Sequence, residues 1–137
     1  MAESELIVFV VDDDEAARES LQALLESAGH RAQTFAGGEA FLEAAGPRTR
    51  GCLILDLHMP GLDGFQVQAK LSERGVILPI IILTGCCDKA TRARALAAGA
   101  IALLEKPVRD EDLLNTLGTA LARLAPASAR PSSGVIG

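Results

Sequence analysis

The amino-acid sequence predicts a doubly wound α/β fold, in which five parallel strands form one sheet and five helices cover its two faces. Short aliphatic or β-branched segments alternate along the chain with longer segments whose apolar residues recur at helical spacing. The short segments are apolar nearly throughout, which is typical of strands that are buried on both faces. Because crossovers between parallel strands are right-handed, the helices then lie on both sides of the sheet. The predicted strands are Leu6 to Val11, Arg31 to Phe35, Cys52 to Leu55, Ile80 to Leu83 and Ile101 to Leu104.

The intervening segments carry the signals of helices. Apolar residues at three-and-four spacing mark the first and the last of them: Ala17, Leu21, Leu24, Leu25 and Ala28, then Leu113, Leu114, Leu117, Leu121 and Leu124. Glycines stand between a helical pattern and the next strand, where a left-handed residue is needed to end a helix: Gly29, Gly46, Gly75 and Gly99. Asp14 with Glu15 is expected to cap the first helix, and Asp88 and Asp110 the fourth and the fifth.

Length, composition and charge indicate one compact soluble domain. At 137 residues the chain suffices for a single core, and 49% hydrophobic residues with 23% charged residues exclude disorder throughout. The net charge of −5 disfavours direct binding of nucleic acid by this segment, because a phosphate backbone needs a concentrated basic face. Arg92 and Arg94 come nearest to such a face, and we interpret them as a solvated side of a helix.

Membrane, secretory and disulfide-bonded classes are also disfavoured. No targeting signal is visible, and the longest apolar stretch, Val76 to Leu83, falls short of the ~20 residues that a spanning helix requires. The three cysteines, Cys52, Cys86 and Cys87, form neither an even framework nor a Cys-x-x-Cys pair. We therefore expect a cytoplasmic protein without a disulfide or a zinc site.

Polar side chains stand where the buried strands end. Asp12 and Asp13 close the first predicted strand, Asp56 closes the third, Thr84 the fourth, and Lys106 follows the fifth. In doubly wound sheets the ligand binds outside the carboxyl ends of the strands, near the point where the strand order reverses. The sequence therefore predicts a pocket with three carboxylates, one ammonium and room for a cation, which suits the acceptance of a phosphoryl group.

Four motifs resemble the receiver domain of two-component response regulators. They are Val10 to Asp14, Leu53 to Gly64, Ile82 to Gly85 and Leu104 to Pro107. The resemblance covers residues 5–124, with the FixJ-like branch closest, and it implies the CheY-like (flavodoxin-like) strand order 2-1-3-4-5. Residues 125–137 are rich in Pro, Ser, Ala and Gly, which predicts a flexible tail or linker.

The resemblance implies specific roles for the residues at the strand ends. Asp56 is the expected phosphoacceptor, which attacks phosphorus in line to form an acyl phosphate. The expected cofactor is Mg²⁺, with Mn²⁺ as an alternative, because two anions must meet and a hard divalent cation with oxygen ligands neutralises their repulsion. The implied ligands are the carboxylates of Asp13 and Asp56, Asp12 mainly through water, and the backbone carbonyl of His58.

Further residues are expected to read the phosphorylated state. We expect Lys106 to bind a phosphoryl oxygen, with its direction set by a cis peptide bond to Pro107. The hydroxyl of Thr84 is expected to bind another phosphoryl oxygen and thereby draw its loop inward. His58 and Cys86 occupy the family positions that adjust the rate of dephosphorylation. Receiver domains usually carry an aromatic residue three positions before the lysine, and its ring rotates inward when the threonine moves. This chain has Leu103 at that position. We therefore expect the partner-binding face of the fourth helix, fifth strand and fifth helix to be formed by aliphatic and alanine side chains.

The resemblance implies a signalling protein rather than an enzyme with turnover, although phosphotransfer is self-catalysed and autodephosphorylation slow. Expected partners are a sensor histidine kinase or phosphotransfer protein upstream, and a downstream protein or a missing C-terminal output domain. A homodimer formed on phosphorylation is also compatible with it. No membrane is expected to take part.

Three other functions share some of these features. A haloacid-dehalogenase-type phosphatase also uses a strand-end aspartate, but it needs a carboxylate two residues later, where this chain has His58. A flavin carrier of the same fold needs a first loop rich in hydroxyls and glycine, and the acidic loop here would repel its phosphate. A phosphorylation-independent interaction module is the third, and intact Asp13, Asp56, Thr84 and Lys106 argue against it.

Overall fold

The computed structural model describes residues 6–124, and these form one parallel five-stranded sheet in the order β2-β1-β3-β4-β5. The strands are β1 (Ile7–Val11), β2 (Arg31–Phe35), β3 (Gly51–Asp56), β4 (Ile80–Thr84) and β5 (Ala102–Glu105). Every strand pair is parallel. The predicted doubly wound fold and its strand order are therefore confirmed, and each predicted strand end lies within one residue of the observed end. The predicted tail, residues 125–137, lies outside the described residues.

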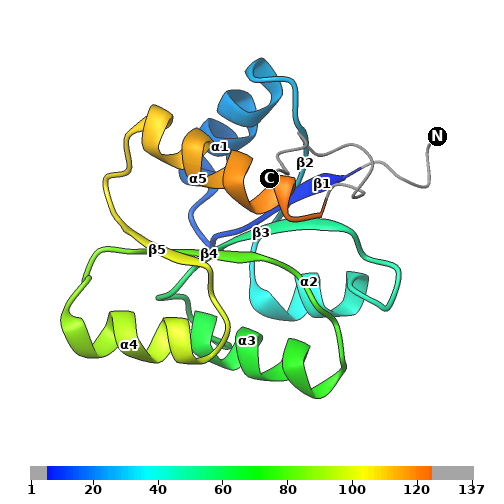
Figure 1. Cartoon of the computed structure of the whole chain (residues 1–137), viewed down its shortest axis with the longest axis vertical. Coiled ribbons are helices and arrows are strands. Elements are labelled where there is room, and N and C mark those ends of the chain that lie inside the picture. Colours follow the sequence, from blue (N-terminus) through cyan, green and yellow to red (C-terminus); the bar gives the residue numbers. More distant parts are fainter. Residues whose placement is uncertain (1–5, 125–137) are drawn as a thin grey trace, which may run out of the picture.

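Helices cover both faces of the sheet, as Figure 1 shows. They are α1 (Glu15–Ser27), α2 (Gly38–Ala44), α3 (Gly64–Glu73), α4 (Lys89–Ala97) and α5 (Asp110–Ala122). Helices α1 and α5 lie on one face, and α2, α3 and α4 lie on the other (Figure 1). None of the helices in residues 6–124 has the length and apolar character that crossing a membrane requires.

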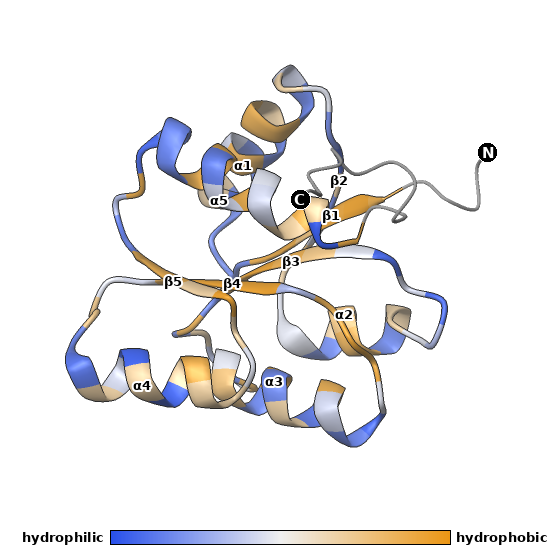
Figure 2. Cartoon of the chain, viewed as in Figure 1, coloured by the Kyte–Doolittle hydropathy of each residue, from blue (hydrophilic) through white to orange (hydrophobic). Residues whose placement is uncertain are grey.

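The core consists of two apolar layers, one on each side of the sheet, because successive side chains of a strand point to opposite faces. On the α1 and α5 side, Val8, Val10 and Ile54 pack with Leu25 and Leu117. On the other side, the layer combines alternate strand residues with residues of the remaining helices: Phe9, Val11, Leu53, Leu55, Phe41, Val67, Leu71 and Ala95. Figure 2 shows the resulting hydrophobic band along β1, β3, β4 and β5, between the helices.

The helix ends agree in part with the sequence. Asp14 and Asp88 cap α1 and α4 as predicted, because their side chains accept hydrogen bonds from the N–H groups of Ala17 and Thr91. The prediction for Asp110 was wrong by one position: it is the first residue of α5, and Arg109 before it makes no side-chain capping bond.

One further local prediction is wrong. Gly46 is not a left-handed helix end, because α2 stops earlier and its C-cap Ala45 is extended. Arg92 and Arg94 are exposed on α4 as predicted, and the guanidinium of Arg94 also lies 3.9 Å from the centroid of the Phe65 ring, a cation–π contact between α4 and α3. The backbone carbonyl of Ala95 accepts a second contact between these helices, from the buried amide of Gln68.

Candidate functional site

The carboxyl ends of β1 and β3 bring the predicted acidic residues together. Val11 and Leu55 are partners in the register of these neighbouring strands, so Asp12 and Asp56 follow side by side. One carboxylate oxygen each from Asp12, Asp13 and Asp56 lies within 4.8 Å of the others. Asp12 and Asp56 are buried, with exposed fractions of 2% and 5%, whereas Asp13 is exposed. The site thus consists of two buried acids and one at the surface.

The turn that carries Asp12 is held at several points. Its N–H donates to the carbonyl of Phe35 over 3.2 Å, and its carbonyl accepts from the guanidinium of Arg18 over 2.8 Å. The carboxylate oxygen Oδ1 accepts from the N–H of Asp14 over 2.9 Å. These contacts fix the backbone and one oxygen of Asp12, while the other oxygen, Oδ2, faces the acidic cluster.

Lys106 brings one ammonium to the same cluster. Its Nζ donates to Oδ1 of Asp56 over 3.1 Å and lies 3.5 Å from Oδ2 of Asp12. The backbone N–H of Lys106 donates to the carbonyl of Thr84 over 2.8 Å, which ties the loop after β5 to the end of β4. The peptide bond from Lys106 to Pro107 is cis.

Burial and charge shift the pKa values of this pair. Burial raises the pKa of Asp56, and the nearby charge of Asp12 raises it further, while the Lys106 ammonium and the N–H of His58 oppose the rise. Burial also acts to lower the pKa of Lys106, but the hydrogen bond to Asp56 and the charges of Asp56 and Asp12 outweigh it, so that pKa is raised. The ammonium therefore stays charged, and the acid that it contacts ionises less readily than an exposed aspartate.

The cluster fits a hard divalent cation. Three carboxylates face one ammonium, so full ionisation leaves an excess of negative charge. Oδ2 of Asp12 is buried and accepts no hydrogen bond, since its 3.5 Å contact with Lys106 is an ion pair only. An orphaned buried carboxylate oxygen is costly. Carboxylate oxygens are the ligands that Mg²⁺ prefers, and Asp12, Asp13 and Asp56 are the residues that would hold it.

Thr84 lies beside the cluster, and its hydroxyl is engaged with its own loop. The residue is fully buried at the end of β4. Its Oγ1 accepts from the N–H of Cys86 over 3.1 Å and donates to the carbonyl of Cys86 over 3.3 Å. To reach a group bound on Asp56, the hydroxyl has to exchange these two bonds for a new one.

The remaining predicted residues surround the site at different depths. The side chain of His58 is exposed, and its backbone N–H hydrogen-bonds to the Asp56 carboxylate. Cys86 is exposed, and its thiol lies 3.6 Å from a carboxylate oxygen of Asp88. Leu103 is only 2% exposed and belongs to the core layer under α4, so it does not contribute an aliphatic side chain to the surface.

Sequence reasoning missed the contact from Arg18 to the carbonyl of Asp12. An arginine six residues after an aspartate is common on any exposed helix, so the sequence contains no signal for the contact. Only the geometry of the β1–α1 turn shows that this side chain folds back over the acidic loop.

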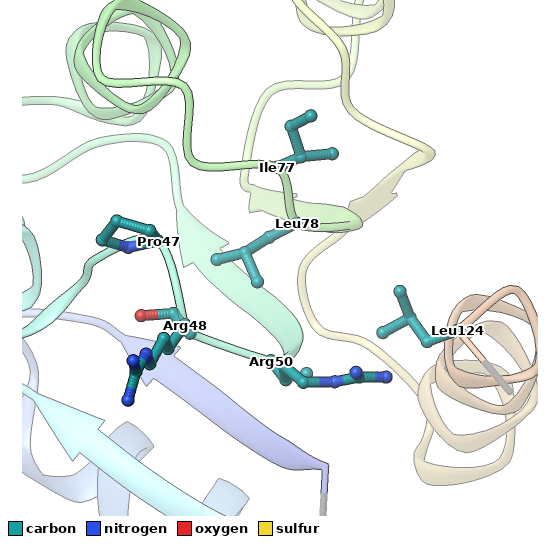
Figure 3. Close-up of a pocket in the computed structure, with 8 residues that line it drawn as sticks. Pro47, Arg48, Arg50, Ile77, Leu78 and Leu124 are labelled. Atoms are coloured by element: carbon teal, nitrogen blue, oxygen red, sulfur yellow. The ribbon is translucent and has the colours of Figure 1, made fainter. Parts of the chain in front are cut away.

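A separate hollow of about 540 Å³ lies at the amino-terminal end of the strands, beside the start of β3 and the segment that precedes β4. Its walls include Arg48, Arg50, Ile77, Leu78 and Leu124, and Figure 3 shows the side chain of Arg50 extending toward Leu124. None of the predicted site residues lines it. The acidic cluster is therefore separate from this hollow.

Comparisons with known proteins agree with this geometry. The model of the response regulator receiver domain matches residues 8–118. The response regulator protein TmoT of Ectopseudomonas mendocina is 44% identical over 126 residues, which are 92% of this chain and 57% of that protein. The transcriptional regulatory protein FixJ of Azorhizobium caulinodans is 40% identical over 120 residues, 88% of this chain and 57% of that protein.

The solved structure of FixJ-N is similar with a TM-score of 0.81 and 32% identity, covering 89% of this chain and 98% of that one. This chain spans little more than half the length of the two curated relatives. The matched family model covers most of the chain, including both buried acids, Asp12 and Asp56. The protein belongs to the response regulator receiver domain family of two-component signalling.

Proposed function

We propose that this receiver accepts a phosphoryl group on Asp56, from the phosphohistidine of a sensor histidine kinase or from a small phosphodonor. One observation carries the proposal: Asp56 is buried at the end of β3, 3.1 Å from an ammonium and within 4.8 Å of two further carboxylates. Mg²⁺ supplies the positive charge that lets two anions meet. Mn²⁺ has the same preference for oxygen ligands and is the alternative ion.

The residues of the chain then have distinct tasks. The Asp56 carboxylate attacks phosphorus in line and forms an acyl phosphate, which makes the transfer self-catalysed. Lys106, already 3.1 Å from Asp56, exchanges this contact for one with a phosphoryl oxygen. Asp12, Asp13 and Asp56 would hold the cation, together with the backbone carbonyl of His58. Exposed His58 and Cys86 flank the product, where they set how fast water removes the phosphoryl group.

Thr84 converts the new charge into a change of shape. Its hydroxyl leaves the backbone of Cys86 and donates to the phosphoryl group, which moves the β4–α4 loop. Position 103 holds a leucine that is packed in the core, so no aromatic ring is available there to move with Thr84. We infer that the change reaches the surface through the loop and α4. A coupling free energy of about 1 to 3 kcal/mol is typical, on the order of 5-fold to 150-fold in partner affinity.

Upstream and downstream partners are part of the same proposal. Residues 5–124 act as the receiver, and 125–137 connect it to an output domain or form a tail beside a downstream protein. FixJ of Azorhizobium caulinodans is named a transcriptional regulatory protein, and it extends well beyond the matched region. This segment itself is not expected to bind nucleic acid, since its net charge is −5.

Phosphorylation of the purified protein tests the proposal. The protein is incubated with Mg²⁺ and acetyl phosphate and then weighed by intact-mass spectrometry. We expect the mass of one phosphoryl group to be gained by wild type and lost in Asp56→Asn. Asp63→Asn, at the half-buried N-cap of α3, is the matched control and should be phosphorylated like wild type. No gain of mass would favour the interaction module, and release of phosphate from many monoesters would favour a phosphatase.

The affinity for Mg²⁺ should fall as the pH is lowered. Burial raises the pKa of Asp56, so its carboxyl takes up a proton at a higher pH than an exposed aspartate does. Protons and the cation compete for the same oxygens, and the metal affinity is lost as the pH falls through this raised pKa. Titration calorimetry from pH 8 downward, to the lowest pH at which the protein stays folded, measures the effect. A Mg²⁺ affinity that falls nowhere in this range would contradict the competition between protons and the cation.

Arg18→Ala should weaken Mg²⁺ binding by about 10-fold, the lower end for residues that support ligands without touching the metal. The guanidinium holds the carbonyl of Asp12, so its loss frees the turn that positions this acid. Arg18→Lys should recover part of the affinity. Arg48→Ala removes an equal charge from an exposed position at the amino-terminal end of the strands, and it should bind Mg²⁺ like wild type. The lost positive charge by itself favours cation binding, so an Arg18→Ala affinity equal to or above that of wild type would contradict the supporting role of this contact.

A further inference from the structure

Two adjacent thiols stand on the loop that Thr84 controls, and their surroundings differ. Cys86 is exposed, and its thiol lies 3.6 Å from a carboxylate oxygen of Asp88. Cys87 is half-buried, packs against the core, and lies with its sulfur 2.9 Å from the guanidinium nitrogen Nη2 of Arg92. Cysteines that only fill the core are buried among apolar side chains. Here Cys86 is exposed to solvent and Cys87 lies beside a guanidinium.

The third cysteine gives an internal comparison. Cys52 is fully buried in β3, and burial raises the pKa of its thiol to about 12. Its thiolate, the form that reacts with oxidants, is therefore scarce at neutral pH, and no solvent reaches it. The loop cysteines differ in their surroundings: Cys86 is exposed, and the half-buried Cys87 has its sulfur 2.9 Å from Nη2 of Arg92. Oxidation of the folded chain should thus select the loop cysteines.

We propose that Cys86 and Cys87 form a reversible thiol-oxidation site that controls the Thr84 loop, with a hydroperoxide as the oxidant. The sulfur of Cys87 attacks a peroxide oxygen, the O–O bond breaks, and the leaving hydroxide takes up the thiol proton of Cys87 to become water, so that Cys87 carries a sulfenic acid. The sulfur of Cys86 then attacks the Cys87 sulfur, and the S–O bond breaks. The hydroxyl leaves with the thiol proton of Cys86 as a second water. The thiols lose two electrons, and the peroxide gains them.

The disulfide would act directly on the switch residue, and this part of the inference depends on the proposed function. The hydroxyl of Thr84 is bonded to both the N–H and the carbonyl of Cys86. Neighbouring Cα atoms are about 3.8 Å apart, closer than the roughly 4.4 to 6.8 Å that disulfides usually span. Ring closure therefore distorts the backbone at Cys86 and breaks the bonds to Thr84. A distorted disulfide is also readily reduced, which makes the modification reversible.

The chemical half of the proposal is tested by mapping the thiols. Reduced protein is treated with equimolar hydrogen peroxide, unfolded, alkylated and digested. We expect Cys52 alone to be alkylated, and the peptide with Cys86 and Cys87 to be two hydrogen atoms lighter. Cys52→Ala should give the same bridged peptide, and Cys86→Ser and Cys87→Ser should each give none. Oxidation of Cys52, disulfides between molecules only, or three free thiols would each overturn the proposal.

The control of the loop is tested by two readouts. In hydrogen exchange, the amide of Cys86 should exchange faster after oxidation, because its bond to Thr84 is broken. With acetyl phosphate and Mg²⁺, the initial rate of phosphorylation should fall by about 5-fold and recover after reduction, in keeping with typical coupling between sites. Unchanged exchange and an unchanged rate would overturn the control. Failure of the reduced protein to be phosphorylated would refute the proposed function, and the exchange measurement would still decide this inference.

Discussion

Lys106→Met should lower the free energy of unfolding of the metal-free protein at neutral pH by about 1 to 3 kcal/mol. The substitution leaves Asp12 and Asp56 buried, with no ammonium between them. Removing one partner of a fully buried ion pair costs roughly 3 to 5 kcal/mol. The side chain of Lys106 is 36% exposed, so solvent screening reduces this figure.

The loss should depend on pH and on Mg²⁺ in defined directions. A carboxyl whose pKa is raised by folding binds its proton more tightly in the folded state, so the unfolding free energy falls as the pH rises through that pKa. The variant should therefore approach wild type as the pH is lowered through that pKa. Mg²⁺ should also restore much of the stability, because the cation takes over the charge that Lys106 supplied.

Urea unfolding at pH 7 and pH 5, with and without Mg²⁺, measures these differences. Lys89→Met is the matched control, because it removes the same charge from an exposed position in the first turn of α4. The control should change stability by less than about 0.5 kcal/mol under every condition. A Lys106 variant that is as stable as wild type without Mg²⁺ at pH 7 would show that the two buried acids are not both ionised there.

The acidic cluster could be predicted because its position depends on the topology alone. Once the strands are parallel, the residues after β1 and β3 must meet at one edge, whatever the side chains around them. Asp12 and Asp56 follow from this rule, and Lys106 follows from the end of β5. The strand bounds could also be predicted from the sequence, because apolar β-branched segments differ clearly from the polar residues that flank them.

Other features depend on side-chain orientation, and the sequence does not encode these in a readable pattern. The hydroxyl of Thr84 bonds to the backbone of Cys86, because the bend after β4 brings the Cys86 amide within 3.1 Å. Leu103 occupies a position that the family resemblance connects with the surface, yet its side chain fills the core. A leucine has no polar tip to keep in water, so burial in the layer beneath α4 is favoured.

Gly51 opens β3, a residue earlier than the sequence predicts, and it meets two constraints at once. Its φ of +143° lies in a region that L side chains rarely adopt. A Cβ atom on this backbone would also overlap the carbonyl oxygen of Ile7, its register partner in β1. The overlap is with backbone on the neighbouring strand, so a side-chain rotation cannot relieve it. A glycine before a strand is common, so the sequence alone does not predict the positive φ or the close approach to Ile7.

Gly51→Ala should therefore lower the free energy of unfolding by more than about 3 kcal/mol, in the range reserved for backbone strain and overpacking. Gly118→Ala is the matched control. Gly118 is exposed within α5, and a Cβ there meets nothing within 4 Å. Alanine at this position should stabilise the protein by about 0.5 to 1 kcal/mol through helix propensity. Urea denaturation followed by circular dichroism compares the two variants.

The pairing of β1 with β3 is what places Asp12 beside Asp56, so the same substitution should also affect the site. If Ile7 and Gly51 separate, the end of the pair near Val11 and Leu55 loses part of its support, and Mg²⁺ affinity should fall together with stability. A Gly51→Ala protein that unfolds at the wild-type urea concentration and binds Mg²⁺ normally would show that β3 can begin at Cys52 without cost. In that case the close approach at Ile7 would not contribute to the geometry of the acidic cluster.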